Sequence, residues 1–211
     1  MKALSRPPPD RAHLAPEQGQ LWHDPSRLVT VSLITGGWGL VYAVYRGYYG
    51  FGGTVGMFGT PTSETDWRAI NLAAAALLLV VALLPVAVVH LWQWPRVRPV
   101  LLAVCWVLAV AFIMHGLVDD VERVLSLTGS LHIHYPFFAR VNRQAGDVQD
   151  LVFNETWFLS EGILWGILGR KGLGRSPGRR RWIVTALTAI AVLTVIGLLS
   201  AFGVIGKLII G

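Results

Sequence analysis

Five stretches of mainly apolar residues alternate with polar segments along the chain, and each is long enough to cross a membrane. We place them at Leu28–Gly50, Ile70–Trp92, Val100–Val118, Leu151–Gly169 and Trp182–Ile205. A helix needs about 20 apolar residues to cross a hydrocarbon core of about 30 Å. Only helices and closed barrels satisfy their backbone groups in lipid, and these stretches lack the alternation of barrel strands. The pattern therefore predicts an all-α membrane protein, a bundle of five transmembrane helices.

The segment before the first apolar stretch has a different character. Residues 1–27 are polar and contain five prolines, of which Pro7–Pro9 are consecutive and favour an extended, unpaired backbone. No small-residue cleavage site follows a short apolar core, so the segment lacks the pattern of a secretory signal peptide. We expect a disordered cytoplasmic tail over residues 1–27 and the transmembrane domain over residues 28–211.

Composition agrees with residence in a bilayer. Apolar residues make up 54% of the chain and charged residues only 14%, whereas a soluble domain is about a quarter charged. The single cysteine excludes an internal disulfide framework and a multi-cysteine metal site. The net charge of +6 does not indicate a nucleic-acid partner, because cytoplasmic loops of membrane proteins collect Lys and Arg. We expect the lipid bilayer, and no nucleic acid, as the surroundings of this chain.

The positions of the basic residues predict the orientation. With the N-terminus in the cytoplasm, the inner segments are the tail, Gln93–Pro99 and Arg170–Arg181, and together they carry 12 of the 18 basic residues. This distribution satisfies the positive-inside rule. We therefore expect a multi-pass protein of the cell membrane with five crossings, a cytoplasmic N-terminus and an outside C-terminus.

Ionisable residues gather in the outer halves of the third and fourth stretches. His115 and Asp119 lie four residues apart and so share a helix face, and Glu161 lies about two turns inside the fourth stretch. Intramembrane charges are costly and usually face a partner within the bundle. His115 and Arg46 are the natural partners of Glu161. Gly162 and Gly166 favour close helix contact, either inside the bundle or at the seam of a homo-oligomer.

Three interpretations remain open for this polar region, of which the third is that residues such as Asp119 and Glu155 simply lie solvated in the headgroup region. The residues form a structural ion-pair network between the third and fourth stretches, or they line an outward-facing pocket that handles a proton, a small cation or a ligand. On the second interpretation the protein, whose activity the sequence does not name, binds a small ligand, a lipid or a protein partner. The candidate ligand-binding residues are Arg46, Glu155, Trp157, Glu161 and Trp165. A proton- or ion-handling transporter subunit is an alternative.

The segment between the third and fourth stretches is longer than a simple turn. Apolar residues from Phe137 to Val152 recur at helical spacing after Pro136, which predicts an interfacial helix; a plain loop with a packed aromatic pair is the alternative. His132 and His134 could both reach a metal ion from one strand face, with Asp147 or Asp150 completing the set. The spacing is common by chance, and we predict neither a metal nor another cofactor.

Several motifs resemble a family of short actinobacterial integral membrane proteins of unknown function. They are the aromatic and Gly-rich stretch Trp38–Gly59, the turn Trp94–Arg96, Trp106, the run Gly116–Asp120 and the stretch Trp157–Gly166. The resemblance covers about residues 30 to 170. It implies a polytopic helix bundle and supplies no activity.

A second resemblance concerns fewer residues. The stretch His115–Asp119, followed by an acidic helix that ends Leu164–Trp165–Gly166, is similar to the emopamil-binding sterol-isomerase family. The resemblance implies a membrane-embedded lipid or isoprenoid isomerase in which His115, Asp119 and Glu161 are the catalytic acid–base candidates.

The predicted orientation can be tested by labelling single cysteines in a Cys105→Ala background. A membrane-impermeant maleimide added to intact cells is expected to react with Thr62→Cys and Gln144→Cys and to leave Ser176→Cys unlabelled until the cells are lysed. Labelling of Ser176→Cys from outside would contradict the five-crossing arrangement.

Overall fold

The computed structural model describes residues 25–205, so nearly all of the tail predicted to be disordered lies outside the described residues. Five long helices dominate the fold, and all five predicted stretches coincide with them in large part. Their bounds are α1 Pro25–Gly50, α2 Glu64–Leu91, α3 Arg98–Leu127, α5 Thr156–Leu173 and α6 Gly178–Ala201. The short elements are β1 Gly59–Pro61, β2 Phe138–Val141, the α-helix α4 Arg143–Gln149 and the π-helical turn η2 Asp150–Glu155.

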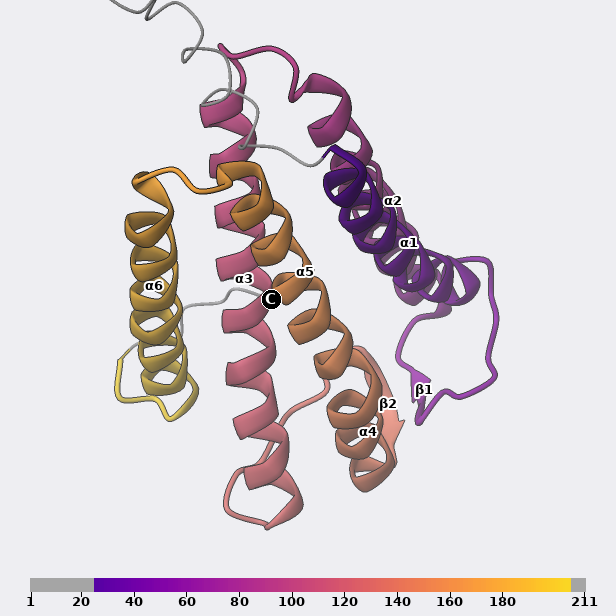
Figure 1. Cartoon of the computed structure of the whole chain (residues 1–211). Coiled ribbons are helices and arrows are strands. Elements are labelled where there is room, and N and C mark those ends of the chain that lie inside the picture. The colour runs from indigo at the N-terminus through magenta and orange to yellow at the C-terminus, as the bar shows by residue number, and fades with distance from the viewer. Residues whose placement is uncertain (1–24, 206–211) are drawn as a thin grey trace, which may run out of the picture.

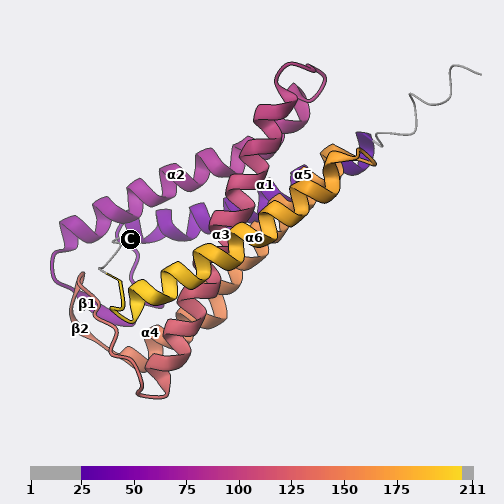
Figure 2. The same cartoon turned by 90° about the vertical axis from the view of Figure 1, so that its left-hand side faces the viewer.

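The long helices form two antiparallel pairs and a peripheral helix (Figures 1 and 2). Helix α1 packs along α2, α3 packs along α5, and α6 lies against α3. Helix α5 also contacts α1, so it joins the two pairs. Toward the end that carries β1 and β2, the α1–α2 pair diverges from α3 and α5 (Figure 1). We call this end the β end, and the opposite end, with Arg170–Arg181, the arginine end.

Four of the helices are long and apolar enough to cross a membrane: α1 from Ser26, α2, α3 and α6. The chain is therefore a multi-pass membrane protein by the length and composition of its helices. Helix α5 is shorter and carries Glu161, Arg170 and Lys171 within its 18 residues. Its crossing of the bilayer, and the orientation of the whole bundle, remain predictions.

The segment before α5 differs from the interfacial helix expected from its apolar spacing. Phe138–Val141 forms a strand that pairs antiparallel with Gly59–Pro61, and the helix begins only at Arg143. The Asn142 side chain accepts a hydrogen bond from the Ala145 amide and caps that helix. Strand pairing overrides the helical periodicity because a partner distant in sequence supplies the backbone hydrogen bonds.

Small residues allow the close helix contacts. A methyl group on Gly36 would lie 2.7 Å from the carbonyl oxygen of Ala82 in α2, and one on Gly162 would lie 2.9 Å from the backbone nitrogen of Ile113 in α3. Contacts of this kind are typical of membrane helix interfaces. Gly162 therefore serves packing inside the bundle, which is one of the two roles that the sequence left open.

Adjacent glycines of α1 provide a matched test of this packing. Gly36→Ala is expected to destabilise the protein by about 1–3 kcal/mol, because the α2 backbone must move away. Gly37→Ala has no atom within 4 Å of the added methyl group and is expected to be neutral or slightly stabilising. Thermal unfolding in detergent measures both, and equal effects of the two variants would contradict the α1–α2 interface.

Candidate functional site

A stacked aromatic pair joins the two helix pairs in the β-end half of the bundle. The rings of Tyr42 in α1 and Trp157 in α5 stack with centroids 4.2 Å apart and planes 14° apart. The Trp157 indole also donates a hydrogen bond of 3.0 Å to the Trp38 carbonyl oxygen. Because both rings are almost fully buried, this contact fixes α1 against α5 next to the polar residues of η2.

A chain of hydrogen bonds runs from this contact through η2 to α3. The Tyr42 hydroxyl donates to Oδ1 of Asn154 at 3.1 Å, and Nδ2 of Asn154 donates to Oδ1 of Asp150 at 2.6 Å. The second Asp150 oxygen lies 3.0 Å from Nε of Arg123 in α3. Polar side chains thus connect α1, η2 and α3.

Arg123 also anchors the segment that precedes η2. Its guanidinium lies 3.6 Å from Asp147, whose buried carboxylate accepts hydrogen bonds from Ser126 at 2.6 Å and Tyr135 at 2.7 Å. Burial and the adjacent Asp147 raise the pKa of Tyr135, so its hydroxyl stays protonated and donates. An ion-pair network thus joins the end of α3 to the segment before α5, with Arg123 at its centre and with aspartates that the sequence pattern did not place in such a network.

A cavity of ≈ 370 Å³ lies beside this network, where the helix pairs diverge. Its polar wall consists of Arg46, His115, Asn154 and Glu155. Its apolar wall comes from α1, α2, α3 and α5: Tyr42, Ala74, Leu77, Leu78, Val81, Phe112 and Phe158. Two residues of the candidate ligand-binding set, Arg46 and Glu155, thus face one space together with the acid–base candidate His115.

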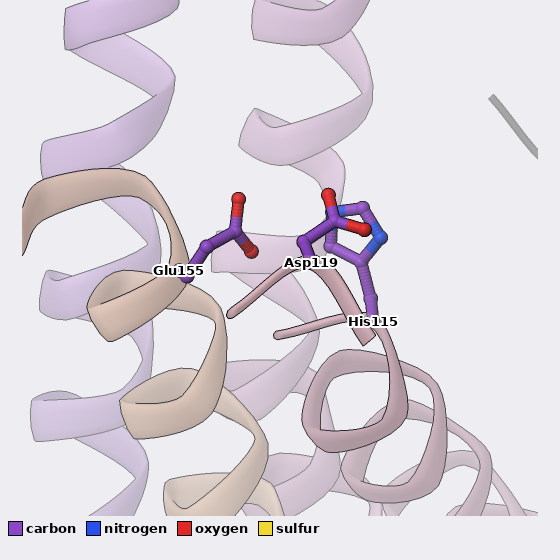
Figure 3. Close-up of side chains that lie close together, drawn as sticks. All are labelled: His115, Asp119 and Glu155. Atoms are coloured by element: carbon purple, nitrogen blue, oxygen red, sulfur yellow. The ribbon is translucent and has the colours of Figure 1, made fainter. Parts of the chain in front are cut away.

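His115, Asp119 and Glu155 form a compact cluster (Figure 3). Nε2 of His115 lies 3.6 Å from Oδ2 of Asp119, and one donor atom from each of the three side chains lies within 4.8 Å of the others. The Glu155 side chain reaches from η2 toward the two α3 residues (Figure 3). Glu155 is only 3% exposed, and its Oε2 has no hydrogen-bond partner. This is an unpaired oxygen at a buried position where most polar groups find a partner.

Glu161 occupies a different place, deeper in the bundle. It is fully buried, and Oε1 accepts a hydrogen bond of 2.9 Å from Nε1 of Trp165, one turn along α5. A methyl group on Gly39 would lie 3.4 Å from the same oxygen, so the carboxyl group faces α1. The expectation of an ion pair to His115 or Arg46 is wrong within the described residues, because α5 turns Glu161 toward the α1–α2 contact.

One of the two loop histidines contacts an arginine, and one of the aspartates considered with them is engaged elsewhere. Nδ1 of His132 lies 2.9 Å from the Arg143 guanidinium, and Asp147 is occupied by Ser126 and Tyr135. Sequence reasoning missed the roles of Tyr42, Asn154 and Arg123. An arginine at the end of an apolar helix, opposite aspartates in the next helical segment, was the available signal for Arg123.

Removing the central cation of the network tests its structural role. Arg123→Gln leaves two buried aspartates without a countercharge and is expected to cost about 3–5 kcal/mol. Arg68→Gln is the matched control, because the Arg68–Glu64 pair is exposed and such pairs contribute about 0–1 kcal/mol. Thermal unfolding in detergent compares them, and similar stability of the two variants would contradict the network.

Comparison with known proteins adds the family. No curated protein and no solved structure matches the chain. The model of the family described as "Protein of unknown function (DUF3995)" matches residues 39–145, which include Arg46, His115 and Asp119. The actinobacterial source and the similarity to sterol isomerases remain predictions. The chain belongs to this DUF3995 family of unknown function.

Proposed function

We propose that the protein binds an amphiphilic, lipid-like ligand in the cavity between the diverging helix pairs. The observation that carries the proposal is the combination of an unpartnered, buried Glu155 oxygen with an apolar wall in one cavity of ≈ 370 Å³. Binding sites for small molecules are typically apolar spaces with a few convergent polar groups. The cavity has this composition, and it adjoins helix surfaces that face lipid.

The position of the apolar wall supports entry from the side. Leu77 of α2 is 67% exposed and lines the cavity, while Leu78 next to it is buried. In a bilayer, an exposed leucine at the rim contacts acyl chains. A lipid-like molecule can therefore enter between α2 and α3 with its apolar part against Leu77 and Phe112.

Within the polar wall, Arg46 supports an anionic group in the ligand, while the unpartnered Glu155 oxygen would accept a hydrogen bond from a donor of the ligand. Arg46 belongs to no ion pair among residues 25–205, so its charge is available to the cavity. Asn154 and His115 add polar side chains beside it. Arginine is suited to phosphate and carboxylate groups because its planar donors match their geometry. We therefore expect a phosphate- or carboxylate-bearing amphiphile to bind better than a neutral one.

Photo-crosslinking tests the proposal with protein purified in detergent. The probe is one equivalent of a phosphatidic acid that carries a diazirine near the glycerol end of one acyl chain. Adducts are expected on the peptides that contain residues 74–81 and 112, as mapped by mass spectrometry. Ala74→Phe, which fills the cavity from α2, is expected to reduce these adducts at least several-fold.

Ala73→Phe is the matched control, because residue 73 is exposed one position away and does not line the cavity. It should leave the adducts unchanged. Arg46→Gln should weaken competition by unlabelled phosphatidic acid more than competition by unlabelled diacylglycerol. Adducts spread evenly over all helices, or equal in the two phenylalanine variants, would refute a specific ligand site.

A further inference from the structure

The His115–Asp119–Glu155 cluster lies at the edge of this cavity and brings two carboxyl groups close together. A carboxyl oxygen of Asp119 lies within 4.8 Å of one of Glu155 (Figure 3). Two carboxylates at such a distance repel each other in a poorly solvated place, unless a proton or a cation lies between them. The nearby guanidinium of Arg123 is already engaged by Asp150 and Asp147.

We propose that His115, Asp119 and Glu155 bind one divalent transition-metal ion, Zn²⁺ or Mn²⁺. A dication balances the two carboxylates while His115 binds as a neutral imidazole. One nitrogen and two carboxylate oxygens form a set that suits both ions. The proposal does not require the lipid-like ligand, although His115 and Glu155 also line the cavity in which that ligand would bind.

The geometry needs only small adjustments. Zinc bonds to nitrogen and oxygen are about 2.0–2.2 Å long, so two ligand atoms on one ion are at most about 4.4 Å apart. The donor atoms of the cluster lie within 4.8 Å of one another. Side-chain rotations of Asp119 and His115, which are only partly buried, would close this difference.

The surroundings support a site that is held in place and open to ions. The Phe158 ring contacts the His115 ring edge-on at 4.3 Å between centroids and so restrains its orientation. A second pocket of ≈ 490 Å³ lies between α3, α6 and the 131–136 loop, and His115 and Asp119 line it. Glu122, His132 and His134 line the same pocket and give an ion a polar route to the cluster.

The π-helical turn explains why Glu155 faces α3. Such turns shift the helix phase and are frequent at functional sites. Here Asn154, the residue before it, is directed to Tyr42 and Asp150, while Glu155 is left without a partner for Oε2. A merely structural carboxylate at this depth would be expected to accept a hydrogen bond.

The test uses full-length protein in detergent, stripped of metal with a chelator and titrated with ZnCl₂ by calorimetry and with MnCl₂ by electron paramagnetic resonance. One ion per chain is expected. Asp119→Asn should weaken binding at least tenfold, whereas Asp120→Asn, a change at the next residue of α3 outside the cluster, should leave the affinity within twofold. No stoichiometric binding of either ion, or equal losses in the two variants, would overturn the proposal.

A measurement on the unaltered protein keeps the proposal testable if a variant fails to fold. Electron spin echo modulation of bound Mn²⁺ should show coupling to an imidazole nitrogen. Its absence at a stoichiometric site would exclude His115 as a ligand and contradict the assignment. Arg46→Gln and Ala74→Phe should retain metal affinity, so failure of the metal site and failure of the lipid site give different results.

Discussion

The ion pair between Arg123 and Asp150 is the interaction on which the β-end half of this protein depends. It holds the start of η2 against α3. Asn154 donates a hydrogen bond to Asp150 and accepts one from Tyr42, so the same network reaches α1. Removing Arg123 would leave Asp147 and Asp150 buried without a countercharge, which is far costlier than losing an exposed pair. The network is therefore structural, and it fixes the backbone from which Glu155 projects.

Among the described residues, two buried glutamates have an oxygen that accepts no hydrogen bond. Glu161 accepts one from Trp165 through its other oxygen, whereas Oε2 of Glu155 has no partner and Glu155 lines the cavity. This oxygen lies where the α1–α2 pair diverges from α3 and α5, so the same divergence creates both the space and the unpaired group. The proposed function thus lies at the cavity, where the helices do not pack closely, whereas the Arg123 network and the close helix contacts stabilise the rest of the bundle.

The sequence predicted the helices well because apolar length and helical spacing are local signals. Trp157, Glu161 and Trp165 recur every four residues and so share one face of α5, and all three are buried. The hydrogen bond from Trp165 to Glu161 follows from this spacing, whereas the direction of that face toward α1 depends on how α5 is rotated in the bundle. The meeting of Glu155 with His115 and Asp119 depends on the π-helical turn, for which the chain has no local signature. Strand β2 was missed because its partner lies about 80 residues earlier, at Gly59–Pro61.

We propose that the free Oε2 of Glu155 serves a partner that is not protein. An experimental structure of the protein extracted with its native lipids, at a resolution that defines side chains, tests this most directly. We expect non-protein density in contact with Glu155, within the cavity between α2 and α3. A closed cavity, with Oε2 of Glu155 hydrogen-bonded to a protein donor, would contradict it.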